Sequence, residues 1–366
     1  MKKHQPILVL TALLLTLSAC NKEMISEQPE LSGQYITFGM PAIGVETGTR
    51  APVDQLPDGS SFGVLGYCLA QYSPTNTELN PASGSQTWNN KKQFCRPEVF
   101  YNQEIIYNKG VCTYSPLKNW YASTDYNYSF FAYYPYGEGK GFTLNTGATD
   151  LGAPKVKFSI PFSGTNVDTP LDESQVPDAM VAQEIDVARN TGQVQLNFLH
   201  ILTGLNFQVN NYNATESGTP GQSVTIHSLK LRGTFYKSIE INFDSGYTFP
   251  NETFSGTYTI LNEDVTIGGL ESVSPIGNKT LLLVSNLTQT GVDNGYLGNV
   301  ELVIEYTFGN GERTVKTFTR PENFLPAGGT IYTAQLNFIG DSFVLNFVVD
   351  NNQEWETGSD SNITFG

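Results

Sequence analysis

The chain has 366 residues and carries 35 acidic side chains against 20 basic ones, which gives a formal net charge of −15 at pH 7. Such an acidic surplus argues against binding to nucleic acid or to anionic lipid headgroups, because like charges repel. A chain of this length can bury more than one hydrophobic core, so two domains are the default expectation.

The N-terminus has the pattern of a lipoprotein signal peptide, predicted over residues 1–19. Two lysines precede an apolar run at residues 7–17, which is too short to span a membrane as a helix. The run ends in the lipobox LSAC, so we expect signal cleavage before Cys20 and lipidation of its thiol. The alternative is an ordinary signal peptide that carries a cysteine by chance. The polar residues 20–31 then predict a flexible tether.

Short stretches in which apolar and polar residues alternate make up most of the remaining chain. Examples lie at residues 194–198 and 300–306, and turn-forming clusters of Gly, Asn and Pro separate such stretches. This pattern predicts an all-β protein built of antiparallel β-sandwiches. The longest polar linker, residues 210–223, places the boundary between an N-terminal domain at 32–212 and a C-terminal domain at 213–366, with a margin of about 20 residues on its early side.

Half of the residues in the stretch 120–137, WYASTDYNYSFFAYYPYG, are aromatic. Strand alternation would place Tyr128 and Phe130 on one face and Phe131 and Tyr133 on the other. A platform for stacking sugars is one interpretation and a buried core strand is the other. We favour the core strand, because carbohydrate sites usually show exposed aromatic rings beside acidic loops.

Catalytic motifs are missing from the sequence. His200 and His227 lie outside any zinc-binding pattern, and no nucleophile elbow, phosphate-binding loop or dinucleotide-binding motif occurs. We therefore expect no enzyme activity, no cofactor and no metal site, and we expect His200 to be half-buried with one ring nitrogen hydrogen-bonded. Glycoside hydrolases act through a pair of carboxylates, and the candidate pair in this sequence is Glu354 and Glu356, on either side of Trp355.

Besides Cys20, the cysteines are Cys68, Cys95 and Cys112. An exported protein can form disulfides, and Cys95 with Cys112 is the nearer pair, so these two are the candidates for one disulfide. Three cysteines cannot all pair within one chain.

Several motifs follow one another in order along the chain. They are the lipobox through Cys20, ITF at 36–38, TRA at 49–51, FGVLGY at 62–67, Trp120, YSFFAYYP at 128–135, DAM at 178–180, FLHIL at 198–202, LNFQV at 205–209, LPAGG at 325–329, Tyr332, Trp355 and ITF at 363–365. With these motifs in this order, the chain resembles the Bacteroidales fimbrillins, which are Mfa/Fim-type lipoprotein subunits of type V pili. The cysteines in the insert-like region 74–118 depart from that pattern.

The resemblance implies a fold, a route of export and a mode of assembly. The fold would be two tandem transthyretin-like β-sandwich domains after the lipoprotein signal peptide. Export would carry the lipid-anchored precursor to the outer-membrane surface, where an arginine-specific protease trims it. Subunits would then join by strand exchange into a fimbria that serves adhesion.

A tetrapeptide near the start of the mature chain recurs at its end. Ile36-Thr37-Phe38-Gly39 is repeated as Ile363-Thr364-Phe365-Gly366, and Arg50-Ala51 follows the first copy in a segment rich in Gly, Thr and Pro. We predict cleavage after Arg50, loss of the strand with Ile36, Thr37 and Phe38, and its replacement by Ile363, Thr364 and Phe365 of a neighbouring subunit. The alternative is that both copies are native strands of one monomer.

The predicted partners are other pilus subunits, lipoprotein signal peptidase and the arginine-specific protease during maturation, the outer membrane through the lipid, and a host or glycan receptor. A competing hypothesis is a surface lipoprotein that does not polymerise and binds glycans through exposed aromatic side chains such as Trp88, Trp120 or Tyr136. A polysaccharide-degrading enzyme is a third and weaker hypothesis, because no motif supports it.

Overall fold

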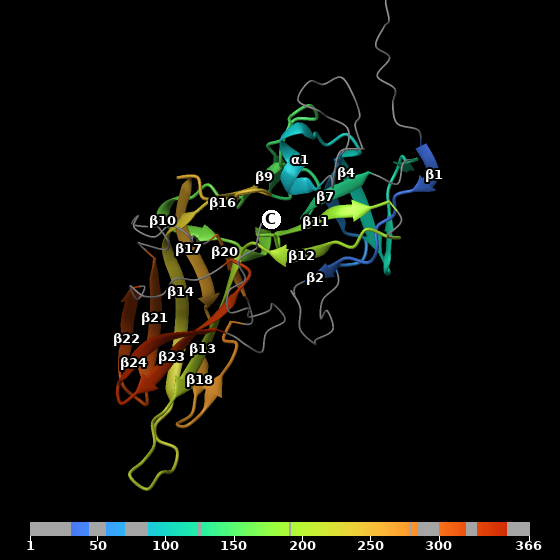
Figure 1. The fold of residues 1–366 in the computed structure, drawn as a ribbon. Helices are drawn as coiled ribbons and strands as arrows, with labels where there is room; N and C mark the ends of the chain where they lie inside the picture. Colours follow the sequence, from blue (N-terminus) through green and yellow to red (C-terminus); the bar gives the residue numbers. More distant parts are fainter. Residues whose placement is uncertain are drawn as a thin grey trace, which may run out of the picture.

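The structure is a computed structural model that describes residues 31–43, 56–69, 87–122, 126–189, 192–277, 280–284, 300–319 and 328–349. Nearly all regular structure in these residues is β-strand, which confirms the predicted all-β class (Figure 1). The short helical elements there are α1 (Trp88–Lys91) and the 3-10 helices η1 (Lys92–Phe94) and η2 (Glu173–Gln175).

The earlier part of the chain forms a sheet of seven described strands. Their order across the sheet is β2 (Ala42–Ile43), β12 (Asn197–His200), β11 (Met180–Ala188), β7 (Asn127–Tyr134), β3 (Ser61–Cys68), β4 (Phe100–Asn108) and β5 (Val111–Thr113). A separate pair joins β1 (Leu31–Tyr35) to β6 (Asn119–Tyr121). Leu31 therefore opens a strand, one residue inside the predicted tether.

Two sheets built mostly from the later part of the chain pack face to face. One contains β10 (Thr165–Leu171), β17 (Thr253–Leu261), β14 (Val224–Tyr236), β21 (Glu301–Phe308) and β22 (Arg313–Thr319), with β18 (Val265–Ile267) beside β14. The other contains β19 (Ser272–Val273), β13 (Thr203–Asn211), β23 (Ile331–Ile339) and β24 (Ser342–Val349), with β20 (Leu281–Leu283) beside β13. Rings meet between the two sheets, since the centroids of Tyr306 and Phe338 are 5.7 Å apart.

A four-stranded sheet joins early and late segments. It contains β16 (Gly246–Thr248), β15 (Ser238–Asn242), β9 (Lys155–Ser159) and β8 (Phe142–Leu144). Most described strand pairs are antiparallel, as predicted, but β2 with β12, β10 with β17, and β13 with β23 are parallel.

Strand pairing crosses the predicted boundary between residues 212 and 213. β13 ends at Asn211, before that boundary, yet it pairs with β20 and β23 of the later part. The change of sheet therefore falls between β12 and β13, inside the margin left on the early side. β9 and β10 also pair with later strands, β15 and β17, so strands from before the predicted boundary belong to sheets of the later part. A linker composition cannot reveal such long-range pairing.

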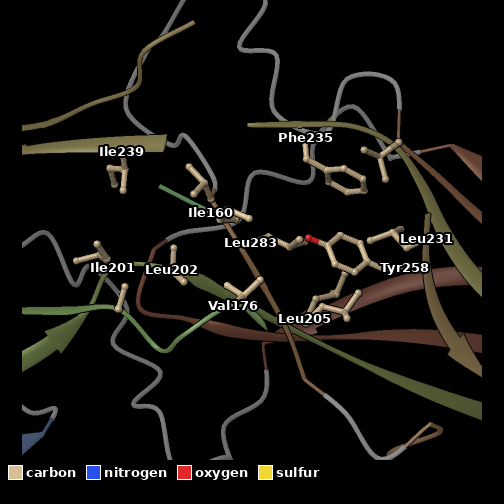
Figure 2. Packing of buried hydrophobic residues seen from close by; sticks show 14 of the residues in the cluster. Ile160, Val176, Ile201, Leu202, Leu205, Leu231, Phe235, Ile239, Tyr258 and Leu283 are labelled. Carbon is tan, nitrogen blue, oxygen red and sulfur yellow. The ribbon is translucent and has the colours of Figure 1, made fainter. Parts of the chain in front are cut away.

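One hydrophobic cluster runs through both parts of the chain. Ile160 and Val176 from the earlier part pack in it together with Tyr258 and Leu283 from the later part (Figure 2). Each of these side chains is at most 6% exposed. Apolar burial of this kind stabilises the arrangement of the sheets relative to one another.

The aromatic strand β7 is buried on both faces. Tyr128 and Phe130 contribute to one hydrophobic cluster, while Phe131 and Tyr133 contribute to the other, and all four are at most 5% exposed. The prediction of a core strand is confirmed. Its physical cause is the position of β7 in the middle of the seven-stranded sheet, between β11 and β3.

The cysteines lie in different parts of the core. Cys95 and Cys112 both keep their thiols, so the suggested disulfide between them is absent. Cys95 belongs to the cluster that runs through both parts, whereas Cys112 packs against the cluster on the other face of the seven-stranded sheet. Burial raises the pKa of the Cys95 thiol to about 12, which keeps it protonated and unreactive.

Candidate functional site

Residues 36–43, here called the edge segment, lie along the edge of the seven-stranded sheet beside residues 194–198. β2 pairs in parallel with β12 (Figure 1). Phe38 forms a parallel bridge with Val194. The Val194 amide donates to the Thr37 carbonyl at 2.8 Å, and the Gly39 amide donates to the Val194 carbonyl at 2.9 Å. The edge segment thus acts as the outermost strand of this sheet.

Residues 112–118, here called the strap, contact the edge segment on its other side. The Ile36 amide donates to the Lys118 carbonyl at 2.8 Å, and the Tyr114 hydroxyl donates to the Ile36 carbonyl at 2.6 Å. The Cys112 thiol lies 3.2 Å from the Gly39 carbonyl. The edge segment is therefore hydrogen-bonded on both sides, to the sheet and to the strap.

Tyr114 and Cys112 are suited to hold backbone carbonyls because both stay protonated at neutral pH. Burial raises the pKa of the Cys112 thiol to about 11, and burial also raises the pKa of the Tyr114 hydroxyl against the opposing effect of the Lys118 carbonyl. A neutral hydroxyl or thiol donates a hydrogen bond, which its anion cannot do. The strap therefore offers two side-chain donors along the edge segment.

Phe38 occupies an aromatic pocket. Its side chain is 3% exposed, and its ring centroid lies 5.7 to 6.4 Å from those of four rings, which belong to Phe62, Phe100, Tyr114 and Phe130. Most of these pairs are edge-to-face, the geometry that the ring quadrupole favours. The pocket is therefore shaped for an aromatic side chain.

The neighbouring positions of the edge segment follow the same pattern of burial. Ile36 is fully buried, Thr37 is exposed, and Gly39 is buried beside the end of the exposed Gln195 side chain. The site thus has a place for Ile, a solvent-facing position and an aromatic pocket, followed by a glycine. The sequence Ile363-Thr364-Phe365-Gly366 has the same four residues in the same order.

The predicted residues of the displaced strand, Ile36, Thr37 and Phe38, therefore lie together in one site. Cys20, the cleavage pair Arg50-Ala51, the donor residues 363–365 and the acid pair around Trp355 lie outside the described residues. The strap was not predicted. Tyr114 and Ile36 are 78 positions apart in sequence, and no local pattern links them.

The aromatic side chains suggested for glycan binding are mostly inside the protein. Trp88 is 1% exposed and Trp120 is 2% exposed, and Tyr136 is partly buried against the core. Trp88 packs edge-on against Tyr67, with centroids 5.1 Å apart. The competing glycan-binding hypothesis required the two tryptophans to be exposed, and this part of it is wrong, because Trp88 and Trp120 each belong to a hydrophobic cluster.

The histidines pair with single acids. The Nδ1 atom of His200 lies 2.8 Å from Asp178, with the imidazole 7% exposed, and that of His227 lies 2.7 Å from Asp264. The expected hydrogen bond at one ring nitrogen of His200 is confirmed. Within the described ranges, no group of three or more His, Cys, Asp or Glu side chains could hold a metal ion.

Comparison with protein families gives one match, to the model described as fimbrillin-like, over residues 49–355. This match covers most of the chain. The chain belongs to the fimbrillin-like family. A search of curated proteins finds no significant match to this fimbrillin-like chain.

Solved structures that are similar to this chain include fimbrial and adhesion proteins. A fimbrial protein from Bacteroides vulgatus shares 20% identity with a TM-score of 0.55, over 86% of this chain and 99% of that one. A putative cell adhesion protein from Bacteroides uniformis shares 13% identity with a TM-score of 0.44, over 80% and 91%. The tip fimbrial protein Mfa3 from Porphyromonas gingivalis shares 10% identity with a TM-score of 0.35, over 80% and 94%. The first of these establishes a common fold.

None of the described helices of this fimbrillin-like chain is both long and apolar enough to cross a membrane.

Proposed function

We propose that this fimbrillin-like chain is a structural and adhesive subunit of a cell-surface fimbria. It is exported as a lipoprotein through Cys20 and reaches the outer membrane as a lipid-anchored precursor. Cleavage after Arg50 frees the edge segment, and the terminal residues Ile363, Thr364 and Phe365 of another copy take its place. The subunit has no catalytic role.

The observation that carries this proposal is the edge segment itself. It lies at the border of a sheet, fills an aromatic pocket with Phe38, and has the same sequence as the chain terminus at its first four positions. The edge segment pairs as a strand only with residues 194–198, and its other hydrogen bonds go to the strap, so a replacement strand can take up the same bonds on both sides. Residues 363–366 would present the same side chains to the same pocket.

The free energy of burying the edge segment favours its replacement by another strand over its loss without replacement. Ile36, Phe38 and Ile43 are at most 9% exposed, and burying three such side chains contributes roughly 5 to 9 kcal/mol. This is a large share of the ordinary stability of a domain. A cleaved subunit would expose an apolar groove, and a strand of matching sequence would restore the lost burial. Subunit assembly would thereby be driven by the free energy of completing the core.

The test is polymer formation after treatment with an arginine-specific protease. The purified chain should form SDS-resistant polymers, while Arg50→Ala and a chain ending at Ser361 should not. Arg313→Ala, which changes an exposed arginine on β22, is the matched control and should polymerise normally. Polymers from either the Arg50→Ala chain or the shortened chain would refute strand exchange by these residues.

The glycan-binding alternative predicts a different result. A surface lipoprotein of that kind would stay monomeric after proteolysis and would bind glycans before and after treatment. The burial of Trp88 and Trp120 removes the two aromatic side chains best suited to such a role.

A further inference from the structure

Residues 212–222, here called the hairpin loop, follow β13 at the end of the later part that is far from the seven-stranded sheet (Figure 1). The sequence pattern predicts a linker between domains here, but the loop is folded. Ala214 and Pro220 form an antiparallel bridge. The Thr215 amide donates to the Thr219 carbonyl at 2.7 Å. This stretch is therefore a structured element that joins β13 to β14 within one sandwich.

Two asparagines fix the base of the hairpin loop. Asn211 is 1% exposed, and its Nδ2 donates to the carbonyls of Gln222 at 2.9 Å and Ile267 at 3.1 Å. The Oδ1 atom of Asn211 accepts from the Asn213 amide at 3.1 Å. Asn213 Oδ1 in turn accepts from the Gly340 amide at 2.9 Å. The two ends of the hairpin loop are therefore held to each other and to the turn between β23 and β24.

A hollow of about 760 Å³ lies between the hairpin loop, the end of β21 and the turn between β23 and β24. This volume is typical of pockets that bind small molecules. The partly buried ring of Phe308 packs against the buried Phe338, with centroids 5.0 Å apart. Because these walls are hydrogen-bonded and packed without a ligand, binding would order little of the chain, which lowers its entropic cost. The walls include Asn213, Pro220, Gln222, Phe308, Gly340 and Asp341.

The polar groups of the hollow suit hydroxyl groups. Within the described residues, Gln222 and Asp341 form hydrogen bonds only through their backbone carbonyls, so both exposed side chains are free to bind. An amide donates and accepts, and a carboxylate accepts at two oxygens, so together they match neighbouring hydroxyls, each of which does both. Phe308 adds an apolar ring face. A sugar presents an apolar C–H face together with hydroxyls at its edge, which fits this combination.

Charge narrows the class of ligand further. None of the described residues that line the hollow is Lys, Arg or His, and Asp341 adds a negative charge to a chain of net charge −15. An anionic ligand would therefore meet no opposite charge here. Organic cations are held by several aromatic rings, whereas Phe308 is the one aromatic residue among the described residues of the hollow. A neutral ligand fits best.

We infer that this hollow binds a neutral sugar, which stacks on Phe308 and places its hydroxyls against Gln222 and Asp341. The inference rests on the proposed adhesive role and names the class of its receptor, a neutral glycan. Where β23 pairs with β24, the pair of residues 339 and 342 lies at the end near the hollow and the pair of residues 332 and 349 at the opposite end. The chain thus leaves β24 away from the hollow, and the edge segment lies in the earlier part (Figure 1). Sugar binding and strand exchange use different parts of the subunit.

Saturation-transfer difference NMR tests the inference on the full chain, uncut at Arg50 and with Cys20→Ser so that no lipid is attached. The probes are the methyl glycosides of glucose, galactose, mannose, fucose, N-acetylglucosamine and N-acetylgalactosamine, with methyl glucuronide as the anionic comparison. At least one neutral glycoside should bind with a dissociation constant on the order of 1 mM, as expected for a small ligand with few contacts. Methyl glucuronide should give no transfer.

Variants of the two free side chains locate the site. Gln222→Ala and Asp341→Ala should each weaken binding at least about threefold, and the double variant at least about tenfold. Their melting temperatures should not change, because both side chains are exposed. Asp168→Ala is the matched control, since it removes an exposed carboxylate on β10, outside the hollow, and it should bind as the wild type does.

Three outcomes would overturn the inference. The first is no saturation transfer from any of the neutral glycosides up to about 10 mM. The second is equal binding of methyl glucuronide. The third is wild-type binding by the double variant, or equal loss in Asp168→Ala and Asp341→Ala. Polymer formation is measured separately after protease treatment. A chain that polymerises but binds no glycoside refutes only the sugar site, and a chain that binds but does not polymerise refutes only strand exchange.

Discussion

Replacing Phe38 by Ala separates the role of the edge segment in the uncut chain from its role after cleavage. In the uncut chain, Phe38 is 3% exposed and contacts four rings. Losing a buried Phe side chain costs about 3 to 5 kcal/mol, of which the edge-to-face contacts supply a part. Tyr35→Ala, three residues earlier on a 53% exposed side chain, should cost less than about 1 kcal/mol.

Guanidinium unfolding of the uncut chains measures this difference. The midpoint should fall strongly for Phe38→Ala and little for Tyr35→Ala. The same variants are then treated with the arginine-specific protease and assembled. Because residue 38 leaves with the cleaved segment, polymers of Phe38→Ala should resist SDS and heat as wild-type polymers do.

Phe365→Ala should give the opposite pattern, with normal stability of the uncut chain and polymers that dissociate at lower temperature. A Phe38→Ala chain destabilised by no more than Tyr35→Ala would refute the aromatic pocket. Weakened Phe38→Ala polymers, or unaffected Phe365→Ala polymers, would refute the exchange of one ITFG copy for the other.

Other predictions concern the core, the strap and the lipid. Phe130→Ala should lower the free energy of unfolding by about 3 to 5 kcal/mol in denaturant titrations, against a small change for the 45% exposed Tyr101→Ala; equal effects would contradict a buried β7. Tyr114→Phe should cost about 0.5 to 1.5 kcal/mol in the same assay, since it removes the bond to the edge segment, and no loss would show that bond to be inessential. The Cys112 thiol has its pKa raised from 9.0 to about 11, so its contribution is complete below pH 9 and is lost as the pH rises through 11; wild type should therefore lose more stability than Cys112→Ala across that range, and parallel losses would contradict this. Cys20→Ala should abolish labelling by an alkyne fatty acid and release the protein from the membrane fraction, whereas retained label would exclude lipidation at that thiol.

The local sequence pattern was enough to predict many of the strands and the burial of the aromatic stretch. Alternation in YSFFAYYP predicts that successive rings point to opposite faces, and β-branched and aromatic residues favour extended backbone. Local pattern did not reveal that β13 pairs with β23 across more than 120 positions. A strand can form hydrogen bonds on two sides, and its own sequence does not specify which strands pair with it.

Residue type and local periodicity were enough to predict the all-β class, the order of motifs, the repeated ITFG and the aromatic core strand. The folded chain was needed to place Ile36 and Phe38 between residues 194–198 and the strap, and to place Cys95 and Cys112 in separate clusters. These features arise from contacts between residues tens to hundreds of positions apart. Such contacts are set by how the sheets pack to bury their apolar faces together, which no single stretch of sequence specifies.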